Sequence, residues 1–354
     1  MVESIQVAGV AGQGIVGVDL GDRSSQICRM DRETGAILEE IRISTTTASV
    51  QKYFGALEPH LVVLESGTHS PWWVRMLRQL GHEVIVANPS KVRAISSSLR
   101  KTDERDARCL AQLARVDPQL LSPVQPRSEE TQKALAVVRA REGLVKARTM
   151  LINQVRGMVK ASGHRLPAGS SASFVRKVQE KVPEELKAAL EPLLRVITEL
   201  SQEIRGLDRE VEAWAKRFPV TERLRQVKGV GALTALVFVL TLGDPHRFAR
   251  SRAVGAYLGL VPASRNSGDS TPQLPISKQG DRLLRRLLVQ ASHYILGPFG
   301  QDSDLRRFGQ RLAQRGGKNG KKRAVVAVAR KLSVLLHRLW VSGTDYEPLR
   351  ATAS

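Results

Sequence analysis

The chain has 354 residues, of which 42% are hydrophobic, so it is long enough for two or three domains with substantial cores. Its 55 Lys and Arg residues against 34 Asp and Glu residues give a net charge of +21, which favours a polyanionic partner. The only cysteines, Cys28 and Cys109, exclude a disulfide framework and a cysteine zinc site, and no run of about 18 apolar residues predicts a membrane span.

The first third of the chain has the pattern of an α/β domain, after residues 1–14, which we interpret as a leader. Strands are expected at residues 15–20, 25–30, 36–43, 61–64 and 83–87, and helices at about 48–57, 71–81 and 103–114. The order β-β-β-α-β-α-β-α is that of the ribonuclease-H fold. In that fold the first strand lies centrally, beside the fourth.

Four acidic residues stand at the ends or starts of these elements. Asp19 ends the first strand, Glu65 follows the apolar residues 61–64, and Asp103 and Asp106 share one face of a helix that Thr102 caps. A carboxylate cluster repels itself unless a cation compensates it, and its hard oxygens favour Mg²⁺. The sequence therefore predicts a site for two magnesium ions about 4 Å apart that serves phosphoryl chemistry. Taken singly, each acid has a plainer interpretation as a turn former or a helix cap.

The middle of the chain is helical. Residues 128–160 form a helical pattern that we assign to the first domain, 15–165, as its trailing helix. Residues 166–220 contain an apolar seam whose steps alternate between four and three, which predicts a coiled coil. The seam packs within one chain or joins two chains, and Pro192 kinks it or marks its first turn. Its residues are Leu186, Leu190, Leu193, Ile197, Leu200, Ile204, Leu207, Val211, Trp214 and Phe218.

The C-terminal domain, residues 221–345 before a tail at 346–354, is expected to be mostly α-helical. From Thr221 onward the chain carries 23 Lys and Arg against 8 Asp and Glu, so this part is the better candidate for gripping a phosphate backbone. Residues 224–240 resemble a helix-hairpin-helix element, whose glycines would turn backbone N–H groups toward a phosphate. A helix-turn-helix packed in the core is the alternative. The candidate nucleic-acid contacts are Lys228, Gly229, Gly231, Lys278, Lys321, Lys322 and Arg323.

A second candidate centre lies in a Gly-, Pro- and Asn-rich loop. Ser267, followed by Gly268, is placed there beside basic residues, where an exposed hydroxyl could attack a phosphodiester. By composition alone Ser264 and Ser270 compete with it, and Ser-Gly is also ordinary turn chemistry.

Several phrases together resemble the Asp-Glu-Asp-Asp (DEDD) transposases of the insertion sequence 110 family, including its insertion sequence 1111 branch. They are GVDLG with Asp19, LES with Glu65, KTDERDARCLA with Asp103 and Asp106, and the C-terminal VKGVGALTA, GLVPASRNSG and ISKQGDRLLRRLL. The resemblance implies a RuvC-like nuclease domain whose acids bind magnesium, a coiled coil and a C-terminal transposase domain.

The same resemblance implies that Ser267 forms a covalent phosphoserine link to DNA. It further implies a structured guide RNA that pairs with donor and target DNA, and a homo-oligomer, dimer or tetramer, in which a serine of one chain can meet the acids of another. The segment after Ser267 departs from the family because it lacks basic residues and adds Asp269. We expect a cytoplasmic, nucleoid-associated enzyme with no membrane partner.

Two rival functions stay open. One is a RuvC-like structure-specific DNA endonuclease that uses water as nucleophile and keeps Ser267 as a structural residue. The other is a non-enzymatic DNA- or RNA-binding protein whose acids have decayed.

Overall fold

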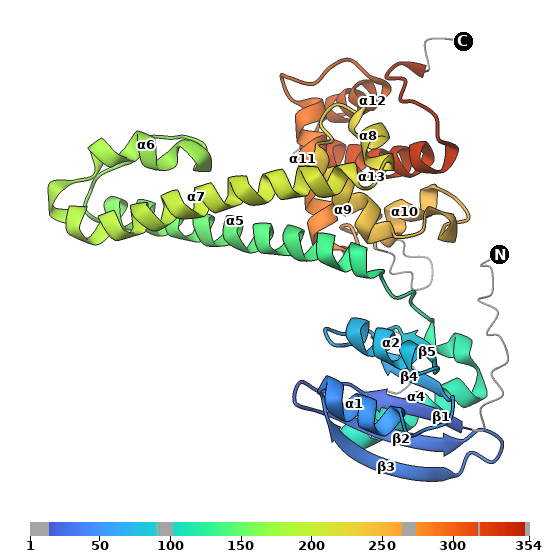
Figure 1. Cartoon of the computed structure of the whole chain (residues 1–354). Coiled ribbons are helices and arrows are strands. Elements are labelled where there is room, and N and C mark those ends of the chain that lie inside the picture. Colours follow the sequence, from blue (N-terminus) through green and yellow to red (C-terminus); the bar gives the residue numbers. More distant parts are fainter. Residues whose placement is uncertain (1–13, 90–91, 93–101, 264–273, 318, 351–354) are drawn as a thin grey trace. The chain divides into compact units, whose positions relative to one another are not determined.

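The structure is a computed structural model that describes residues 14–89, 92, 102–263, 274–317 and 319–350 (Figure 1). Its contacts divide the chain into two units, Ser4–Ser128 and Glu129–Ser354. The helix expected to trail the first domain begins at Glu129 and packs along a helix of the second unit, so the contacts group it with that unit.

The first unit is built on a five-stranded mixed sheet in the order β3-β2-β1-β4-β5. β1 pairs antiparallel with β2 and parallel with β4, which confirms the expected central place of the first strand beside the fourth. β2 pairs antiparallel with β3, and β4 pairs parallel with β5. The strands are β1 Gly14–Asp19, β2 Ser24–Asp31, β3 Ile37–Ser44, β4 Leu61–Glu65 and β5 Glu83–Ala87.

Helices cover both faces of this sheet, as is usual for a sheet that contains buried parallel strands. Alternate strand residues such as Val16 and Val62 pack with α1 and α2 on one face. Their neighbours Ile15 and Val63 pack with α4 on the other face. The helices are α1 Thr47–Phe54, α2 Ser70–Gln79, α4 Asp103–Val116 and the 3-10 turn η1 Pro118–Leu121.

The second unit begins with a long helical hairpin made of α5 Glu129–Ala161 and α7 Lys187–Lys216. Arg141 reaches Asp208 and Arg148 reaches Ser201, so the two helices run antiparallel within one chain. The link between them contains η2 Ser171–Ser173, α6 Phe174–Val178, η3 Gln179–Lys181 and η4 Glu184–Leu186. The expected seam thus has a partner inside the chain, and Pro192 lies within α7 as its second turn begins.

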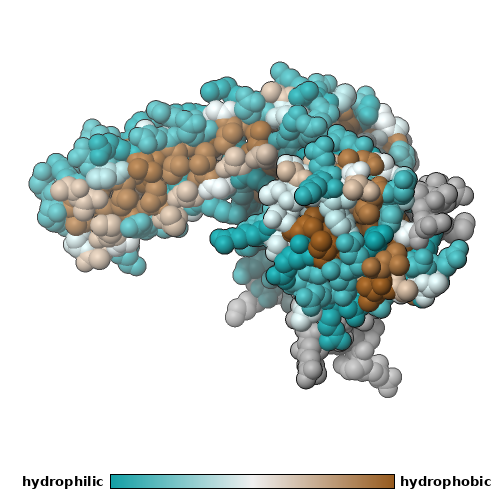
Figure 2. All heavy atoms as spheres, turned by 60° about the horizontal axis from the view of Figure 1, so that its bottom comes forward, coloured by the Kyte–Doolittle hydropathy of each residue, from teal (hydrophilic) through white to brown (hydrophobic). Residues whose placement is uncertain are grey.

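The buried stripe of α7 is displaced from the expected seam. Every second seam position is buried, namely Leu190, Ile197, Ile204 and Val211, together with Leu194, Ser201 and Ala215. The other seam positions Leu193, Leu200, Leu207 and Trp214 are only half-buried. A single partner covers one side of the apolar surface, and Figure 2 shows an apolar band along the hairpin. The buried positions still follow steps of four and three from Leu190 to Ile204, so the heptad spacing is kept along a stripe that is rotated from the expected seam.

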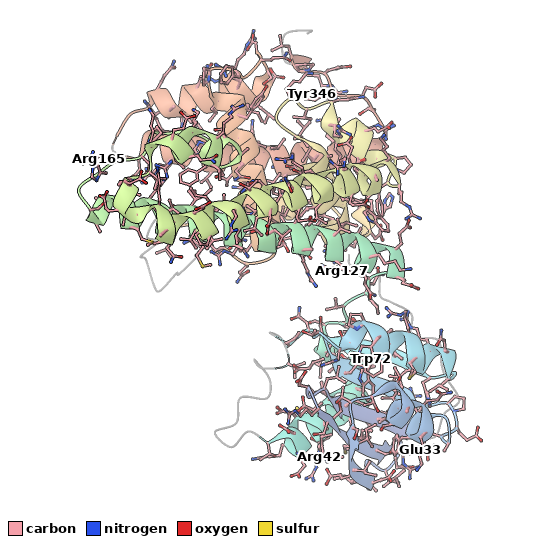
Figure 3. The ribbon with its side chains drawn as sticks, turned by 60° about the vertical axis from the view of Figure 1, so that its left-hand side comes forward. Glu33, Arg42, Trp72, Arg127, Arg165 and Tyr346 are labelled. Carbon is pink, nitrogen blue, oxygen red and sulfur yellow. The ribbon has the colours of Figure 1, made fainter. Side chains whose placement is uncertain are left out.

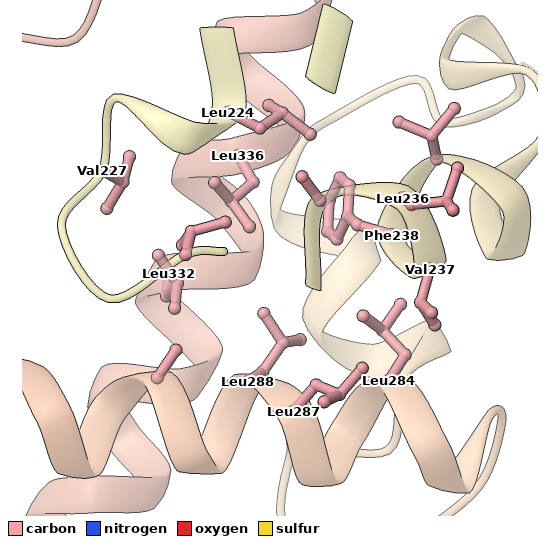
Figure 4. Close-up of a cluster of buried hydrophobic side chains, with 14 of the residues drawn as sticks. Leu224, Val227, Leu236, Val237, Phe238, Leu284, Leu287, Leu288, Leu332 and Leu336 are labelled. Carbon is pink, nitrogen blue, oxygen red and sulfur yellow. The ribbon is translucent and has the colours of Figure 1, made fainter. Parts of the chain in front are cut away.

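The rest of the second unit is a cluster of helices around one large apolar core (Figure 4). α9 is buried over nearly its whole length, and Phe238 and Leu288 lie in the same core. The elements are α8 Val220–Arg225, α9 Ala232–Leu242, η5 Pro245–Arg247, α10 Arg252–Tyr257, α11 Arg282–Leu296, α12 Asp304–Gln314 and α13 Gly320–Ser342. None of the helices that the structure describes has the length and hydrophobicity to cross a membrane.

Candidate active site

Asp19 and Glu65 end two neighbouring parallel strands at the same edge of the sheet. The register pairs Val18 with Leu64, so the two acids follow at the same level, on strands that lie about 4.8 Å apart. Both residues are half-buried, whereas the strand residues before them are buried. The pairing of the two strands therefore fixes the Cα positions of Asp19 and Glu65, independently of their side-chain rotamers.

Both acids point toward the face of the sheet that α4 covers. A Cβ built on Gly17 would lie 2.0 Å from the Ala107 carbonyl oxygen, so Gly17 faces α4 at close range. Asp19, two residues on, points to the same side, and Glu65 does so because Val63 pairs with Gly17. Glycine is required at position 17 because any side chain would push the helix off the strand.

α4 brings Asp103 and Asp106 to this edge by its first turn. The Thr102 hydroxyl accepts a hydrogen bond from the Arg105 N–H, which confirms the expected cap. The C-terminal end of α4 lies at the opposite edge, where Arg115 donates to the Glu33 carbonyl. The helix therefore runs antiparallel to β1 with its acidic first turn at the Asp19 edge, where carboxylates also suit the helix dipole.

Two arginine–carboxylate pairs hold α4 over the sheet. Arg108 makes a bidentate pair with Glu40 of β3, with Nη2 at 2.8 and 2.9 Å from the carboxylate oxygens. Closer to the edge, Arg42 Nη2 lies 3.4 Å from Asp103 Oδ2, and Figure 3 labels Arg42 within this unit. In the register of the sheet Asp19 pairs with Gln26, and Gln26 pairs with Arg42. Arg42, which contacts Asp103, therefore lies two strands away from Asp19 at the same level of the sheet.

The four acids therefore come from three elements that share one edge, but they are not gathered into a closed ligand set. Across the described residues, no three His, Cys, Asp or Glu side chains form a group that could hold a metal ion. Asp103 is engaged by Arg42 instead. The chemistry of the donors still suits a hard divalent cation, because all four are carboxylates and reach the edge from the same face.

A histidine near this edge was missed by sequence reasoning. His69, in the loop after β4, has Nε2 at 3.3 Å from Asp22 Oδ1 in the loop after β1. Trp72 Nε1 donates to His69 Nδ1 over 3.3 Å, so the proton of the neutral ring sits on Nε2, facing Asp22. Only the parallel pairing of β1 and β4 places these two loops together, and neither carries a motif.

The thiol on the α4 face of the sheet is chemically quiet. Cys28 pairs with Gly17 in the register and is fully buried. Burial, with a smaller contribution from the nearby Glu40 carboxylate, raises the pKa of Cys28 to about 11. Its thiolate is therefore scarce at neutral pH, and Cys28 is a packing residue rather than a nucleophile.

Ser267, with its competitors Ser264 and Ser270, lies outside the described residues. The chain enters and leaves that segment through a short ribbon in which Pro262 pairs with Ile276. Lys278, at the foot of the ribbon, is exposed and has a positive φ of 56°. The structure thus shows the base on which the candidate serine segment is mounted.

The candidate nucleic-acid contacts lie on the surface of the second unit. Lys228, Lys278, Lys321, Lys322 and Arg323 are all exposed. The last three occupy the first turn of α13, which has no acidic residue. Cations are unfavourable at a helix N-terminus, so local helix stability does not explain them.

The segment expected to form a helix-hairpin-helix element consists of α8, the connection at residues 226–231 and α9. Gly229 has φ +98°, and a Cβ there would meet Tyr294 Cδ1 at 3.0 Å and the Ala291 carbonyl at 3.2 Å. Gly229 thus permits close packing against α11. Gly231 precedes the first turn of α9 and meets nothing within 4 Å of a built Cβ. Of the two glycines, only Gly231 has open space beside it.

Comparison with known proteins adds a family assignment to this geometry. A family model for transposases, of the DEDD IS110 type, matches residues 16–162, which include all four candidate acids. A second model, described as the transposase IS116/IS110/IS902 family, matches residues 221–302, which include Ser267. The first match crosses the division between the two units at Ser128.

Whole transposases are also similar over nearly their full lengths. A probable family 20 transposase of Pseudomonas aeruginosa is 30% identical over 341 residues, 94% of this chain and 98% of that protein. The transposase for insertion sequence element IS1111A of Coxiella burnetii is 29% identical over 96% of this chain and 92% of its own. The transposase for element IS1328 of Yersinia enterocolitica is 32% identical, covering 80% and 84%.

Proposed function

The chain belongs to the IS110 family of DEDD transposases, and we propose that it cuts and rejoins DNA through a covalent serine–phosphate link assisted by magnesium. One observation carries the metal half of this proposal. Three elements far apart in sequence, β1, β4 and α4, bring Asp19, Glu65, Asp103 and Asp106 to one edge of one sheet. An acidic edge of this kind suits a phosphodiester substrate, because metal ions held by carboxylates can polarise the scissile phosphate.

The four carboxylates would hold the magnesium, which when bound neutralises the phosphate and polarises its bonds. Asp19 and Glu65 are fixed by strand pairing, and Asp103 and Asp106 by the capped first turn of α4. Arg42 Nη2 lies 3.4 Å from the Asp103 carboxylate. These residues therefore define the donor set with little backbone freedom.

Ser267 supplies the nucleophile in the proposal. Its Oγ forms a bond to phosphorus as the bond from phosphorus to one DNA oxygen breaks; the serine proton is lost and that oxygen leaves as a strand-end hydroxyl. A strand-end hydroxyl later attacks the phosphoserine and releases the serine. Because the ester keeps the energy of the phosphodiester, strands are rejoined without ATP.

The grip on nucleic acid is assigned to the second unit. Lys228, Lys278, Lys321, Lys322 and Arg323 are exposed, and this part of the chain holds most of the positive surplus. The proposal extends to a structured guide RNA transcribed beside the gene, and to a homo-oligomer. Sequencing the RNA that purifies with the protein tests the first, and mass measurement in solution tests the second.

The decisive experiment is a search for the covalent adduct. The full chain is incubated with magnesium, with DNA made from the two ends of its element, and with RNA transcribed from the adjoining non-coding stretch. We expect a protein–DNA adduct on denaturing gels that Ser267→Ala abolishes and that Ser264→Ala and Ser270→Ala leave in place. Mixing Ser267→Ala with an Asp106→Asn variant tests whether acids and serine act from different chains.

The outcomes separate the rivals. Strand cleavage that survives Ser267→Ala without an adduct would favour the water-using endonuclease. Binding without any cleavage, in the unsubstituted protein as in Asp103→Asn and Asp106→Asn, would favour the non-enzymatic binding protein.

A further inference from the structure

Residues 261–263 and 275–277 flank the serine segment, residues 264–273, and pair with each other as a short antiparallel ribbon. The Ala263 N–H donates to the Pro275 carbonyl and the Ser277 N–H donates to the Val261 carbonyl, both over 2.9 Å. Among the described residues this ribbon joins no larger sheet, and an isolated pair of strands is only marginally stable in water. Something further must hold its two sides together.

Two glycines at the foot of the ribbon allow its sides to touch. A Cβ on Gly259 would lie 2.3 Å from the Gln279 nitrogen, and one on Gly280 would lie 2.1 Å from the Tyr257 oxygen. Both glycines have positive φ, 65° and 73°, so both the space and the backbone conformation exclude a side chain. Between them Lys278 also has a positive φ, which is uncommon for a residue with a side chain.

Arg285 of α11 forms hydrogen bonds to both sides of the chain at this foot. Its Nη1 donates to the Leu258 carbonyl over 2.9 Å and to the Gln279 carbonyl over 2.6 Å. The first carbonyl precedes the ribbon and the second follows it, so one guanidinium nitrogen bridges the chain entering and the chain leaving. Hydrogen bonds from an ionised donor are about twice as strong as hydrogen bonds between two neutral groups.

The helix that carries Arg285 is itself anchored. The Asp281 side chain caps α11 by accepting from the Leu284 N–H over 2.7 Å. The next residue, Arg286, makes a bidentate pair with Glu142 of α5, and those hydrogen bonds lower the pKa of Glu142. Arg285 therefore reaches the foot of the ribbon from a helix tied to the long hairpin.

We propose that Arg285 is a positioning residue for the serine chemistry: by bridging the two carbonyls it fixes the separation and direction of the ribbon that bears residues 264–273. The inference rests on the proposed function, because it gives the bridge a purpose only if Ser267 attacks DNA. A nucleophile displaced by about 1 Å loses roughly 100-fold in rate. Holding the base of its segment is therefore worth a dedicated charged side chain.

The test compares Arg285→Gln with Arg282→Gln. Arg282 is exposed one turn earlier on α11, so both variants remove the same charge from the same helix. We expect Arg285→Gln to slow adduct formation at saturating DNA by about 10- to 100-fold. We expect its DNA affinity to fall no further than that of Arg282→Gln, and its melting temperature to stay near that of the control. Arg285→Lys, which keeps the charge but loses the planar guanidinium, should also be slowed.

A second readout does not depend on catalysis. Trypsin cleaves after Arg265, within the serine segment. Cleavage there should be faster in Arg285→Gln than in Arg282→Gln or the unsubstituted protein. If Arg285→Gln proves unfolded, Arg285→Lys takes its place in both measurements.

The outcomes distinguish this inference from the function on which it rests. Adduct formation by Arg285→Gln at the rate of Arg282→Gln overturns the positioning role and leaves the serine mechanism standing. An unsubstituted protein that cleaves DNA without any Ser267 adduct overturns both.

Discussion

The two units place their candidate catalytic groups in different ways. In the α/β unit, the acids Asp19 and Glu65 end paired strands, so the same hydrogen bonds that build the sheet set their positions. In the helical unit, the segment bearing Ser267 springs from an isolated ribbon that Gly259, Gly280 and Arg285 hold at its foot. Strand pairing alone fixes the positions of acids within a sheet, whereas an isolated ribbon requires additional contacts to fix the position of the segment it carries.

The first way to break this comparison is to remove one acid. Asp106→Asn keeps the size of the side chain and removes one anionic donor from the first turn of α4. Loss of part of the metal-binding charge should lower the rate of DNA cleavage by about 10³-fold, which corresponds to several kcal/mol of transition-state stabilisation. Single-turnover cleavage with magnesium measures it. Glu104→Gln, an exposed acid on the same turn, is the matched control and should stay within a few-fold.

A substitution at Gly17 should show how closely the acidic edge depends on packing. Gly17→Ala places a methyl group 2.0 Å from the Ala107 carbonyl, so α4 must shift on the sheet. We expect a loss of about 3 kcal/mol in the free energy of unfolding, near the upper range for overpacked cores. Urea denaturation followed by tryptophan fluorescence measures it. Gly67→Ala, where nothing lies within 4 Å, should change stability little, and an equal loss in both variants would contradict the account.

A smaller effect should appear in both units as pH falls. Each contains a buried histidine, His82 in the first unit and His337 in the second, whose pKa is lowered chiefly by burial. His82 Nδ1 accepts a hydrogen bond from the backbone N–H of His60, and its Nε2 faces the Phe54 carbonyl. His337 Nε2 faces the Pro245 carbonyl. The unfolded chain then binds more protons below its ordinary pKa of about 6.5 than the folded chain does. Stability is present above that pH and decreases as pH falls through it, until the lowered folded pKa is passed.

Denaturation at pH 7.5 and 5.5 measures this slope. Tryptophan fluorescence reports the first unit alone in a Trp214→Phe and Trp340→Phe background, because the remaining tryptophans, Trp72 and Trp73, lie in that unit. His82→Gln should flatten the slope in the first unit only, while the exposed His164→Gln should alter neither. A slope that survives His82→Gln in the first unit would assign it to other groups.

Much of the α/β unit could be predicted because its signals are local. Val84–Ala87 is an unbroken apolar run closed by Asn88-Pro89, and Thr102 stands one residue before the helix it caps. The order of the elements then fixes β1 beside β4. The reason for Gly17 could not be predicted, because it depends on a carbonyl 90 positions later in the chain. The Arg42–Asp103 pair and the His69–Asp22 contact are likewise products of strand pairing rather than of any motif.

The hairpin shows the other kind of shortfall. The heptad steps located α7 correctly, but periodicity describes an apolar surface and does not say how much of it one partner covers. With α5 as its partner, α7 buries Leu194 and Ala215, which lie beside the expected seam, and leaves Leu193 and Leu207 half-buried.

The antiparallel course of α5 and α7 has a consequence for how this arm can vary in length. Glu130 lies near Arg217 at one end, and Arg148 near Ser201 further along, so residues face each other in matched steps. Removing or adding whole turns in both helices together would move the link between α5 and α7 while leaving the junction with α8–α13 unchanged. Relatives with longer or shorter arms could therefore differ in reach without any change in the machinery at either end.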